Sequence, residues 1–187
     1  MKLLVFNSTP LIYLARVGLS KVLEDLEGEK VTSPEVKREV VDEGKSKGVP
    51  DAVVLEKLFD SQVFQVDEPK DKEFLSRLLK TRGLHVTDAE VLALAQELNG
   101  VAVVDDEVAR NNAKVYGIAY VGTPYVLARA VYEGLITKER AKQAVNEMVS
   151  AGWRCSVESY AKIIEASEVE QVQRALRGRG KRSRLST

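Results

Sequence analysis

Residues 87–123 read TDAEVLALAQELNGVAVVDDEVARNNAKVYGIAYVGT and contain the pattern that decides the fold. A run with helical spacing, VLALAQEL, leads into the short apolar segment VAVV. A second helical segment, EVARNNAKVYG, then leads into the apolar segment IAYV. Because helices that alternate with short apolar runs are typical of strands lying parallel in one sheet, this stretch predicts a parallel sheet covered by helices.

The same alternation extends over the rest of the chain. The predicted strands are residues 2–6, 30–32, 63–66, 101–104 and 118–121. Helix starts are marked by a hydroxyl residue before a proline at Thr9-Pro10, Ser33-Pro34 and Thr123-Pro124, and by a capping box at Thr87–Glu90. Further helices are predicted over residues 124–132 and 138–150 and around 157–167. The sequence therefore predicts an α/β fold with a mostly parallel sheet.

Length and composition are typical of one globular domain. The chain has 187 residues, of which 44% are hydrophobic and 30% charged, and this excludes a disordered chain and a collagen-like repeat. We see no internal repeat, and we predict one domain over residues 1–167 followed by a flexible basic extension over 168–187. The apolar run at the N-terminus stops at Asn7, which is too short for a signal peptide or a membrane span, so we expect a cytoplasmic protein without a membrane partner.

The net charge of zero hides an uneven distribution. The chain has 28 basic and 28 acidic residues, but its last 16 residues contain six basic residues and no acid. These are Arg174, Arg177, Arg179, Lys181, Arg182 and Arg184. Residues 1–171 therefore carry a net charge of −6, and the extension is a candidate for nucleic-acid binding, although a basic terminus can also be merely solvated.

Single copies of cysteine and histidine exclude several kinds of site. With Cys155 and His85 as the only such residues, one chain can build neither a disulfide framework nor a zinc cluster. A nucleophile–histidine catalytic pair would have to use His85. That residue lies in the polar turn RGLHVTD, so a loop role is the simpler interpretation.

Oxygen-bearing side chains gather at the expected carboxyl ends of the strands, where ligands bind in open parallel sheets. The set comprises Asn7, Glu39, Asp88, Glu90, Asp105, Asp106 and Thr123. Converging carboxylates repel one another by roughly 1–4 kcal/mol per pair, so a true cluster requires a cation or shared protons. Oxygen ligands without histidine or cysteine indicate Mg²⁺ or Mn²⁺, which are ions that promote phosphodiester hydrolysis.

Each acidic residue also has a purely structural interpretation. Glu90 completes the predicted capping box, and Asp88 lies in a first helical turn where the helix dipole favours a carboxylate. Asp105 or Asp106 can cap the following helix, and Glu39 can belong to a solvated helix face. Their placement at one end of the sheet is what favours a common function.

Several motifs together resemble those of PIN-domain proteins. They are NSTPLIYLARVGL, PEVKREVVDEG, the stretch 87–123 and ARAVYEGLI. More closely, the chain resembles prokaryotic PIN-like proteins described as predicted nucleic-acid-binding proteins, over about residues 1–167. The resemblance implies a three-layer α/β/α fold and the activity of a Mg²⁺- or Mn²⁺-dependent ribonuclease acting on single-stranded RNA, as in the toxins of toxin–antitoxin pairs.

The resemblance also assigns site residues. The acidic site of the family corresponds to Asn7, Glu39, Asp88 and Asp106, with Asp105 as a further metal ligand. Glu90 and Thr123 are then expected around the site or at its rim. The departure is Asn7, where active PIN nucleases have aspartate. Asparagine still offers a carbonyl oxygen, but the loss of one negative charge lowers the expected metal affinity.

Two functional hypotheses follow. The first is a metal-dependent ribonuclease that hydrolyses RNA, which could be a toxin with an antitoxin partner. The second is a catalytically degenerate PIN-like module that binds RNA or a protein. A homodimer that supplies basic residues near the acidic cleft is a further expectation.

Overall fold

The structure, a computed structural model, describes residues 3–154. The predicted helix at 157–167 and the basic extension at 168–187 lie outside the described residues. The chain divides into two compact units, Met1–Thr123 and Pro124–Thr187. The single domain over residues 1–167 stays a prediction.

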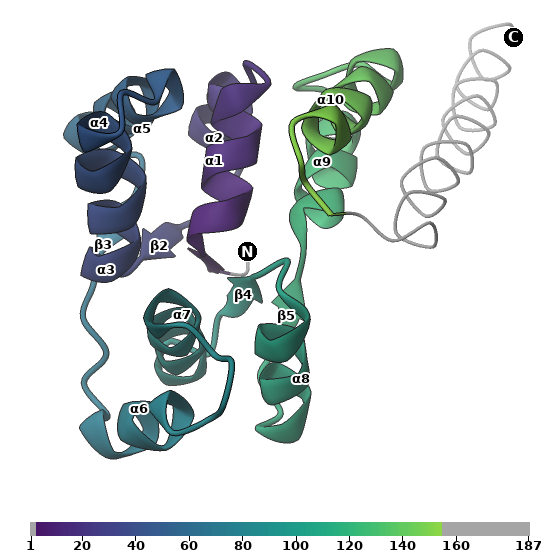
Figure 1. The fold of residues 1–187 in the computed structure, drawn as a ribbon. Helices are drawn as coiled ribbons and strands as arrows, with labels where there is room; N and C mark the ends of the chain where they lie inside the picture. Colours follow the sequence, from purple (N-terminus) through teal and green to yellow (C-terminus); the bar gives the residue numbers. More distant parts are fainter. Residues whose placement is uncertain (1–2, 155–187) are drawn as a thin grey trace, which may run out of the picture. The chain divides into compact units, whose positions relative to one another are not determined.

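A five-stranded parallel sheet organises the first unit, in the order β3-β2-β1-β4-β5 (Figure 1). The strands are β1 (Leu4–Phe6), β2 (Lys30–Thr32), β3 (Gln65–Val66), β4 (Val101–Val103) and β5 (Tyr120–Val121). Every neighbouring pair is parallel, which confirms the predicted α/β class. The strand order reverses between β1 and β4, and in such sheets this switch point opens a crevice beyond the strand ends.

Helices cover both faces of the sheet. Those of the first unit are α1 (Ser8–Arg16), α2 (Ser20–Asp25), α3 (Pro34–Lys37), the π-helix η1 (Arg38–Glu43), α4 (Gly44–Ser46), α5 (Pro50–Asp60), α6 (Lys72–Leu79), α7 (Val86–Glu97) and α8 (Glu107–Val115). Helices α1, α2, α4 and α5 lie on one side of the sheet and α6, α7 and α8 on the other (Figure 1). This is the three-layer α/β/α architecture that was predicted.

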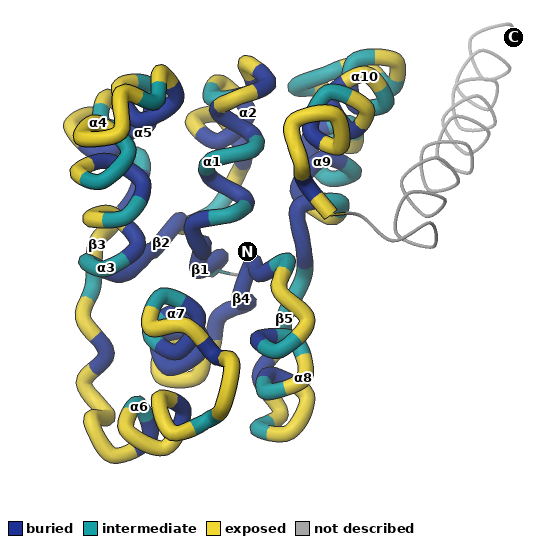
Figure 2. The backbone as a smooth tube through the Cα atoms, viewed as in Figure 1, coloured by how far each residue is buried: buried dark blue, intermediate teal, exposed yellow. Residues whose placement is uncertain are grey.

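The core of the first unit lies between the strands and the helices (Figure 2). Strands β1 and β4 are buried along their whole length. Helix α7 is buried on most sides, with Val91 through Ala95 at most 1% exposed, because it packs against α6, α8, β1 and β4. Helices that are apolar all round are typical of such a central position.

Two predicted helix starts are wrong. Helix α1 begins at Ser8, and its cap is Asn7 rather than Thr9, because the Asn7 side chain accepts a hydrogen bond from the Ser8 backbone N–H. Helix α7 begins at Val86, so Thr87 lies inside the helix and no capping box forms there. The residue at the cap position of α7 is His85, whose side chain makes no capping hydrogen bond.

Two other predicted caps are confirmed. Ser33 caps α3 with Pro34 at the first helical position, and Asp106 caps α8. Helix α3 continues directly into η1, in which the backbone widens to π-helical pairing. Glu39 lies in the first turn of this segment. Single-turn π segments within helices occur frequently at functional sites.

The described part of the second unit consists of α9 (Thr123–Tyr132), whose first residue belongs to the first unit, and α10 (Lys138–Ser150). Both agree with the prediction to within a residue. Thr137 caps α10 by accepting a hydrogen bond from the Arg140 backbone N–H. Among residues 3–154, no helix is both long and apolar enough to span a membrane.

Candidate functional site

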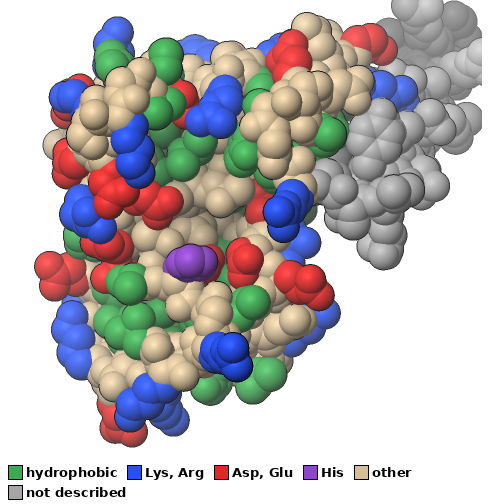
Figure 3. Space-filling view, viewed as in Figure 1, with side chains coloured by type: hydrophobic (Ala, Val, Ile, Leu, Met, Phe, Trp, Pro, Cys, Tyr) green, Lys and Arg blue, Asp and Glu red, His purple; other side chains and the backbone are tan. Residues whose placement is uncertain are grey.

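A cavity of about 490 Å³ lies beyond the ends of β1 and β4, at the switch point of the sheet. It is lined by Asn7, Ser8, Thr9, Glu35, Arg38, Glu39, Glu43, His85, Val86, Thr87, Asp88 and Asp106. Acidic and basic side chains are interspersed on the surface near α3 and α7 rather than forming one acidic face (Figure 3). The structure thus brings Asn7, Glu39, Asp88 and Asp106 to one pocket.

Asn7 links the start of α1 to Asp88. Its Oδ1 accepts a hydrogen bond from the Ser8 backbone N–H at 2.8 Å, and its Nδ2 donates to Asp88 Oδ1 at 2.6 Å. The backbone donor determines which end of the amide is the oxygen. The carbonyl oxygen of Asn7 is therefore engaged by α1, and the side chain acts on Asp88 as a hydrogen-bond donor.

Asp88 is the most perturbed carboxylate of the pocket. It is 2% exposed, and burial together with the negative charge of Asp106 raises its pKa to about 6. Hydrogen bonds from the His85 backbone and from Asn7, and the charge of His85, oppose this shift only in part. The ionised form of Asp88 is therefore destabilised in the fold, and a nearby cation would relieve this cost.

Asp106 and Glu39 reach the pocket from different elements. Asp106 is exposed, and its Oδ1 accepts the hydrogen bond of the Ala109 backbone N–H at 3.0 Å. Glu39 comes from η1, where its Oε2 accepts a hydrogen bond from Ser8 Oγ at 2.7 Å. Ser8 thus positions Glu39 next to the start of α1. Sequence reasoning did not single out Ser8, although it directly follows Asn7.

Asp105 has other partners than its neighbour Asp106. Its two oxygens accept hydrogen bonds from the Thr123 backbone N–H at 2.9 Å and from Thr123 Oγ1 at 2.6 Å, and Arg110 pairs with it at 3.4 Å. Asp105 does not belong to the lining of the cavity. These contacts favour a role in tying the segment after β4 to the end of β5, and the metal-ligand role of Asp105 stays an untested prediction.

The remaining predicted site residues lie away from the cavity lining. Thr123 is fully buried against Asp105, and Glu90 is partly buried on α7, where its Oε2 has no hydrogen-bond partner among the described residues. The basic residues of the C-terminal extension lie outside the described residues. Their predicted role in nucleic-acid binding is therefore not tested.

A charged rim borders the pocket on the side of α3 and η1, and sequence reasoning missed it. The guanidinium of Arg38 donates to Glu35 through Nε at 2.8 Å and to Glu43 through Nη1 at 2.7 Å. Arg38 lowers the pKa of Glu35, and Lys47 together with Arg38 lowers that of Glu43. The spacing of Glu35 and Arg38, three residues apart on a helix, is the signal that would have indicated this pair.

The carboxylates of the pocket fit a small divalent cation that takes only some of its ligands from the protein. Mg²⁺ is commonly held by one or two carboxylates, with water and substrate phosphate as its other ligands. Asp88 and Asp106 supply such a pair, and the raised pKa of Asp88 marks a charge without sufficient compensation. Among residues 3–154, no three acidic or histidine side chains converge as metal ligands. The pocket therefore fits a two-carboxylate site better than a cage made by the protein alone.

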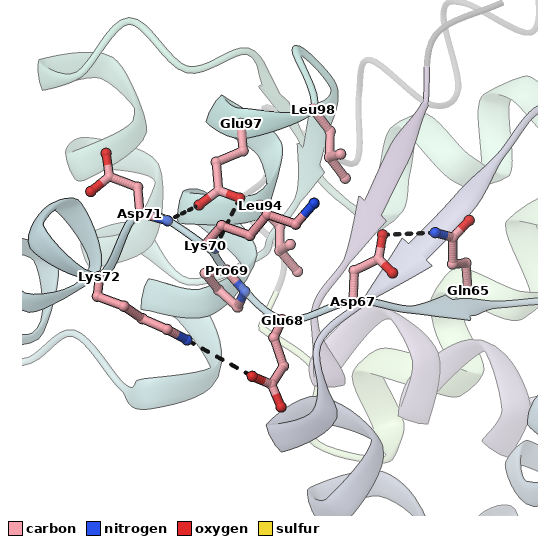
Figure 4. Close-up of a pocket in the computed structure, with 10 residues that line it drawn as sticks. All are labelled: Gln65, Asp67, Glu68, Pro69, Lys70, Asp71, Lys72, Leu94, Glu97 and Leu98. Carbon is pink, nitrogen blue, oxygen red and sulfur yellow. Dashed lines mark hydrogen bonds and ion pairs between the residues drawn. The ribbon is translucent and has the colours of Figure 1, made fainter.

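A second cavity, of about 780 Å³, lies between the segment 65–72 and the C-terminal end of α7 (Figure 4). The Glu97 carboxylate accepts hydrogen bonds from the backbone N–H groups of Lys70 at 3.0 Å and Asp71 at 2.7 Å. Gln65 donates to Asp67 in the same cavity. These polar groups hold the segment against α7, and no predicted site residue lies here.

Comparison with known proteins agrees with this architecture. No curated protein matches the chain. Residues 3–169 match a protein family described as a PIN domain, which covers the sheet, the carboxylate pocket and most of the second unit. PIN domains have a nuclease-type fold and generally depend on a divalent metal. On the strength of this match, the chain belongs to the PIN-domain family.

Proposed function

We propose that this chain is a metal-dependent nuclease of PIN type that hydrolyses phosphodiester bonds in RNA. The observation that carries the proposal is the pair Asp88 and Asp106 at the switch point of the sheet. A buried carboxylate with a raised pKa in a cleft is typical of a functional site. The family match supports the same kind of chemistry.

In this proposal, Asp88 and Asp106 hold Mg²⁺ or Mn²⁺, and Glu39 is a further carboxylate in the lining of the pocket. The ion, when bound, would activate a water molecule and stabilise the charge that develops on the phosphate. Ser8 keeps Glu39 in place through its hydroxyl, and Asn7 orients Asp88 through its amide N–H. In contrast to an aspartate at position 7, Asn7 adds no negative charge to the pocket.

Cleavage of end-labelled single-stranded RNA by the purified chain with Mn²⁺ tests the proposal. We expect cleavage that EDTA suppresses and that Asp106→Asn abolishes. Asp71→Asn is the matched control, because Asp71 caps α6 through the Phe74 backbone N–H, as Asp106 caps α8, but does not line the pocket. Asparagine is as good a helix cap as aspartate, so both variants should fold. Equal cleavage by Asp106→Asn and wild type would refute the assignment.

The second candidate is a non-catalytic binding module. It is favoured by Asn7, whose amide already compensates Asp88 in part, and by the shortage of converging carboxylates among the described residues. Tight binding of RNA without turnover in Mn²⁺ would support this candidate over the nuclease.

A toxin controlled by an antitoxin, and a homodimer, are narrower forms of the proposal. The test of the first is growth arrest on expression of the chain, relieved by a protein encoded beside it. The test of the second is the mass of the purified chain in solution, measured by light scattering.

A further inference from the structure

A polynucleotide that enters this pocket meets several carboxylates and needs cations to hold its phosphates. Of the described residues that line the pocket, only Arg38 and His85 can carry positive charge. Arg38 lies on η1, and His85 lies directly before α7. The two therefore border the pocket from different elements.

Arg38 retains donors for a ligand. Its guanidinium is about half exposed and donates hydrogen bonds to Glu35, through Nε and Nη2, and to Glu43, through Nη1. A guanidinium has five N–H groups, so two remain beyond these three hydrogen bonds. The two carboxylates also hold the planar group in one orientation, which reduces the entropy lost when a phosphate binds.

His85 also lines the pocket, and helix α7 starts without a hydrogen bond from its ring. It is exposed, and its side chain does not cap α7, although it occupies the cap position. The imidazole presents an N–H donor in either protonation state. Val86, which follows it in the lining, is 48% exposed and adds an apolar surface against which a base can lie.

We infer that Arg38 and His85 form a two-sided phosphate clamp that holds a single-stranded polynucleotide across the carboxylate pocket. This inference rests on the proposed function for the class of substrate, but it concerns binding and not turnover. The clamp contacts the backbone, so it carries no sequence preference.

The test is the affinity of the full chain for a fluorescein-labelled oligonucleotide, measured by anisotropy in EDTA so that no cleavage occurs. We expect Arg38→Gln and His85→Gln each to weaken binding by about three- to tenfold. Arg38→Gln should also reduce the slope of log K against log salt by about 0.7, the value for one phosphate neutralised on a single strand. His85→Arg should bind at least as tightly as the wild type, because it retains an N–H donor at this position.

Lys45→Gln is the control. Lys45 lies on α4, in the same continuous helical segment as Arg38, and also pairs with a carboxylate, that of Glu56, but it does not line the pocket. This variant should bind as the wild type does. Thermal melting of all variants in the same buffer checks that they are folded.

Unchanged affinity in both Arg38→Gln and His85→Gln would overturn the clamp, as would an unchanged salt slope in Arg38→Gln or a wild type that does not bind. RNA and DNA of one sequence should lose affinity by the same factor, and a loss confined to RNA would contradict a phosphate contact. A wild type that binds through the clamp but does not cleave in Mn²⁺ would contradict the nuclease alone. If the wild type cleaves RNA but neither Arg38→Gln nor His85→Gln weakens oligonucleotide binding, the clamp alone is contradicted.

Discussion

The same pocket contains two pairs of carboxylates in opposite electrostatic conditions. The inner pair, Asp88 and Asp106, combines burial of one member with mutual repulsion, and the pKa of Asp88 rises to about 6. The rim pair, Glu35 and Glu43, is partly exposed, and Arg38, together with Lys47 at Glu43, compensates its charge, so the pKa of both carboxyls falls. Within residues 3–154, the fold therefore supplies a cation to the rim and none of comparable effect to the inner pair. A metal ion is expected where the compensation is incomplete.

When one carboxylate of the inner pair and one of the rim pair are mutated in turn, the largest difference is expected in catalysis. Asp88→Asn should reduce RNA cleavage in Mn²⁺ by at least about 10³-fold, because loss of a metal-holding charge removes several kcal/mol of transition-state stabilisation. Glu35→Gln on the rim should reduce it less than about tenfold. Initial rates on one labelled RNA measure both. A similar loss in the two variants would show that the inner pair has no special role.

The second effect concerns stability without metal. A carboxyl whose pKa is raised by folding binds its proton more tightly in the native state, so its contribution to stability falls as pH rises from about 4 to about 6. The full cost, up to about 3 kcal/mol for a shift of two units, is present above pH 6. Asp88→Asn should therefore be more stable than wild type at pH 7.5 in EDTA and lose this advantage near pH 4, as urea unfolding would measure.

Metal binding should offset the loss of stability that the ionised form of Asp88 causes. At 100 times its Kd, Mn²⁺ should stabilise the wild type by about 2.7 kcal/mol, and this gain should shrink below pH 6 as Asp88 takes up its proton. Asp106→Asn should show little gain, and Asp71→Asn the full gain. Thermal shifts in a Mn²⁺ titration at pH 7.5 and 5.0 measure this. An equal shift in Asp106→Asn would place the metal elsewhere.

The smallest expected effect separates Asp105 from its neighbour. Thr123→Val removes the hydroxyl that donates to Asp105 Oδ2 and leaves a largely buried carboxylate oxygen without that donor, which should cost about 1–3 kcal/mol of stability. Thr123→Ser keeps the hydroxyl donor and should therefore retain most of the stability that Thr123→Val loses. Cleavage by the folded Thr123→Val variant should stay near that of the wild type. A loss of Mn²⁺ binding in this variant would instead support Asp105 as a ligand.

Several features could be predicted from local pattern alone. The short apolar runs and the helical spacing between them predicted the position of all five strands. For β1, β2 and β4 the reason is that burial between two helical layers requires near-continuous apolar segments, whereas the edge strand β3 is exposed. The starts of α1 and α7 were placed wrongly, because a hydroxyl near a proline or glutamate is only one of several groups that can cap a helix. At α1 the amide of Asn7 takes that place, and α7 begins earlier without a side-chain cap.

The carboxylate pocket could be predicted only in outline. The sequence by itself determined that acidic residues follow the strands, since strand ends are visible in the apolar pattern. Only the tertiary structure decided that Asp105 turns to Thr123 while Asp106 lines the pocket, and that Asn7 donates to Asp88. The physical reason is that strand order and helix packing bring together residues 81 positions apart, and no local pattern contains that information. The same holds for Arg38 and His85, which border one cavity only because η1 and α7 meet at the switch point of the sheet.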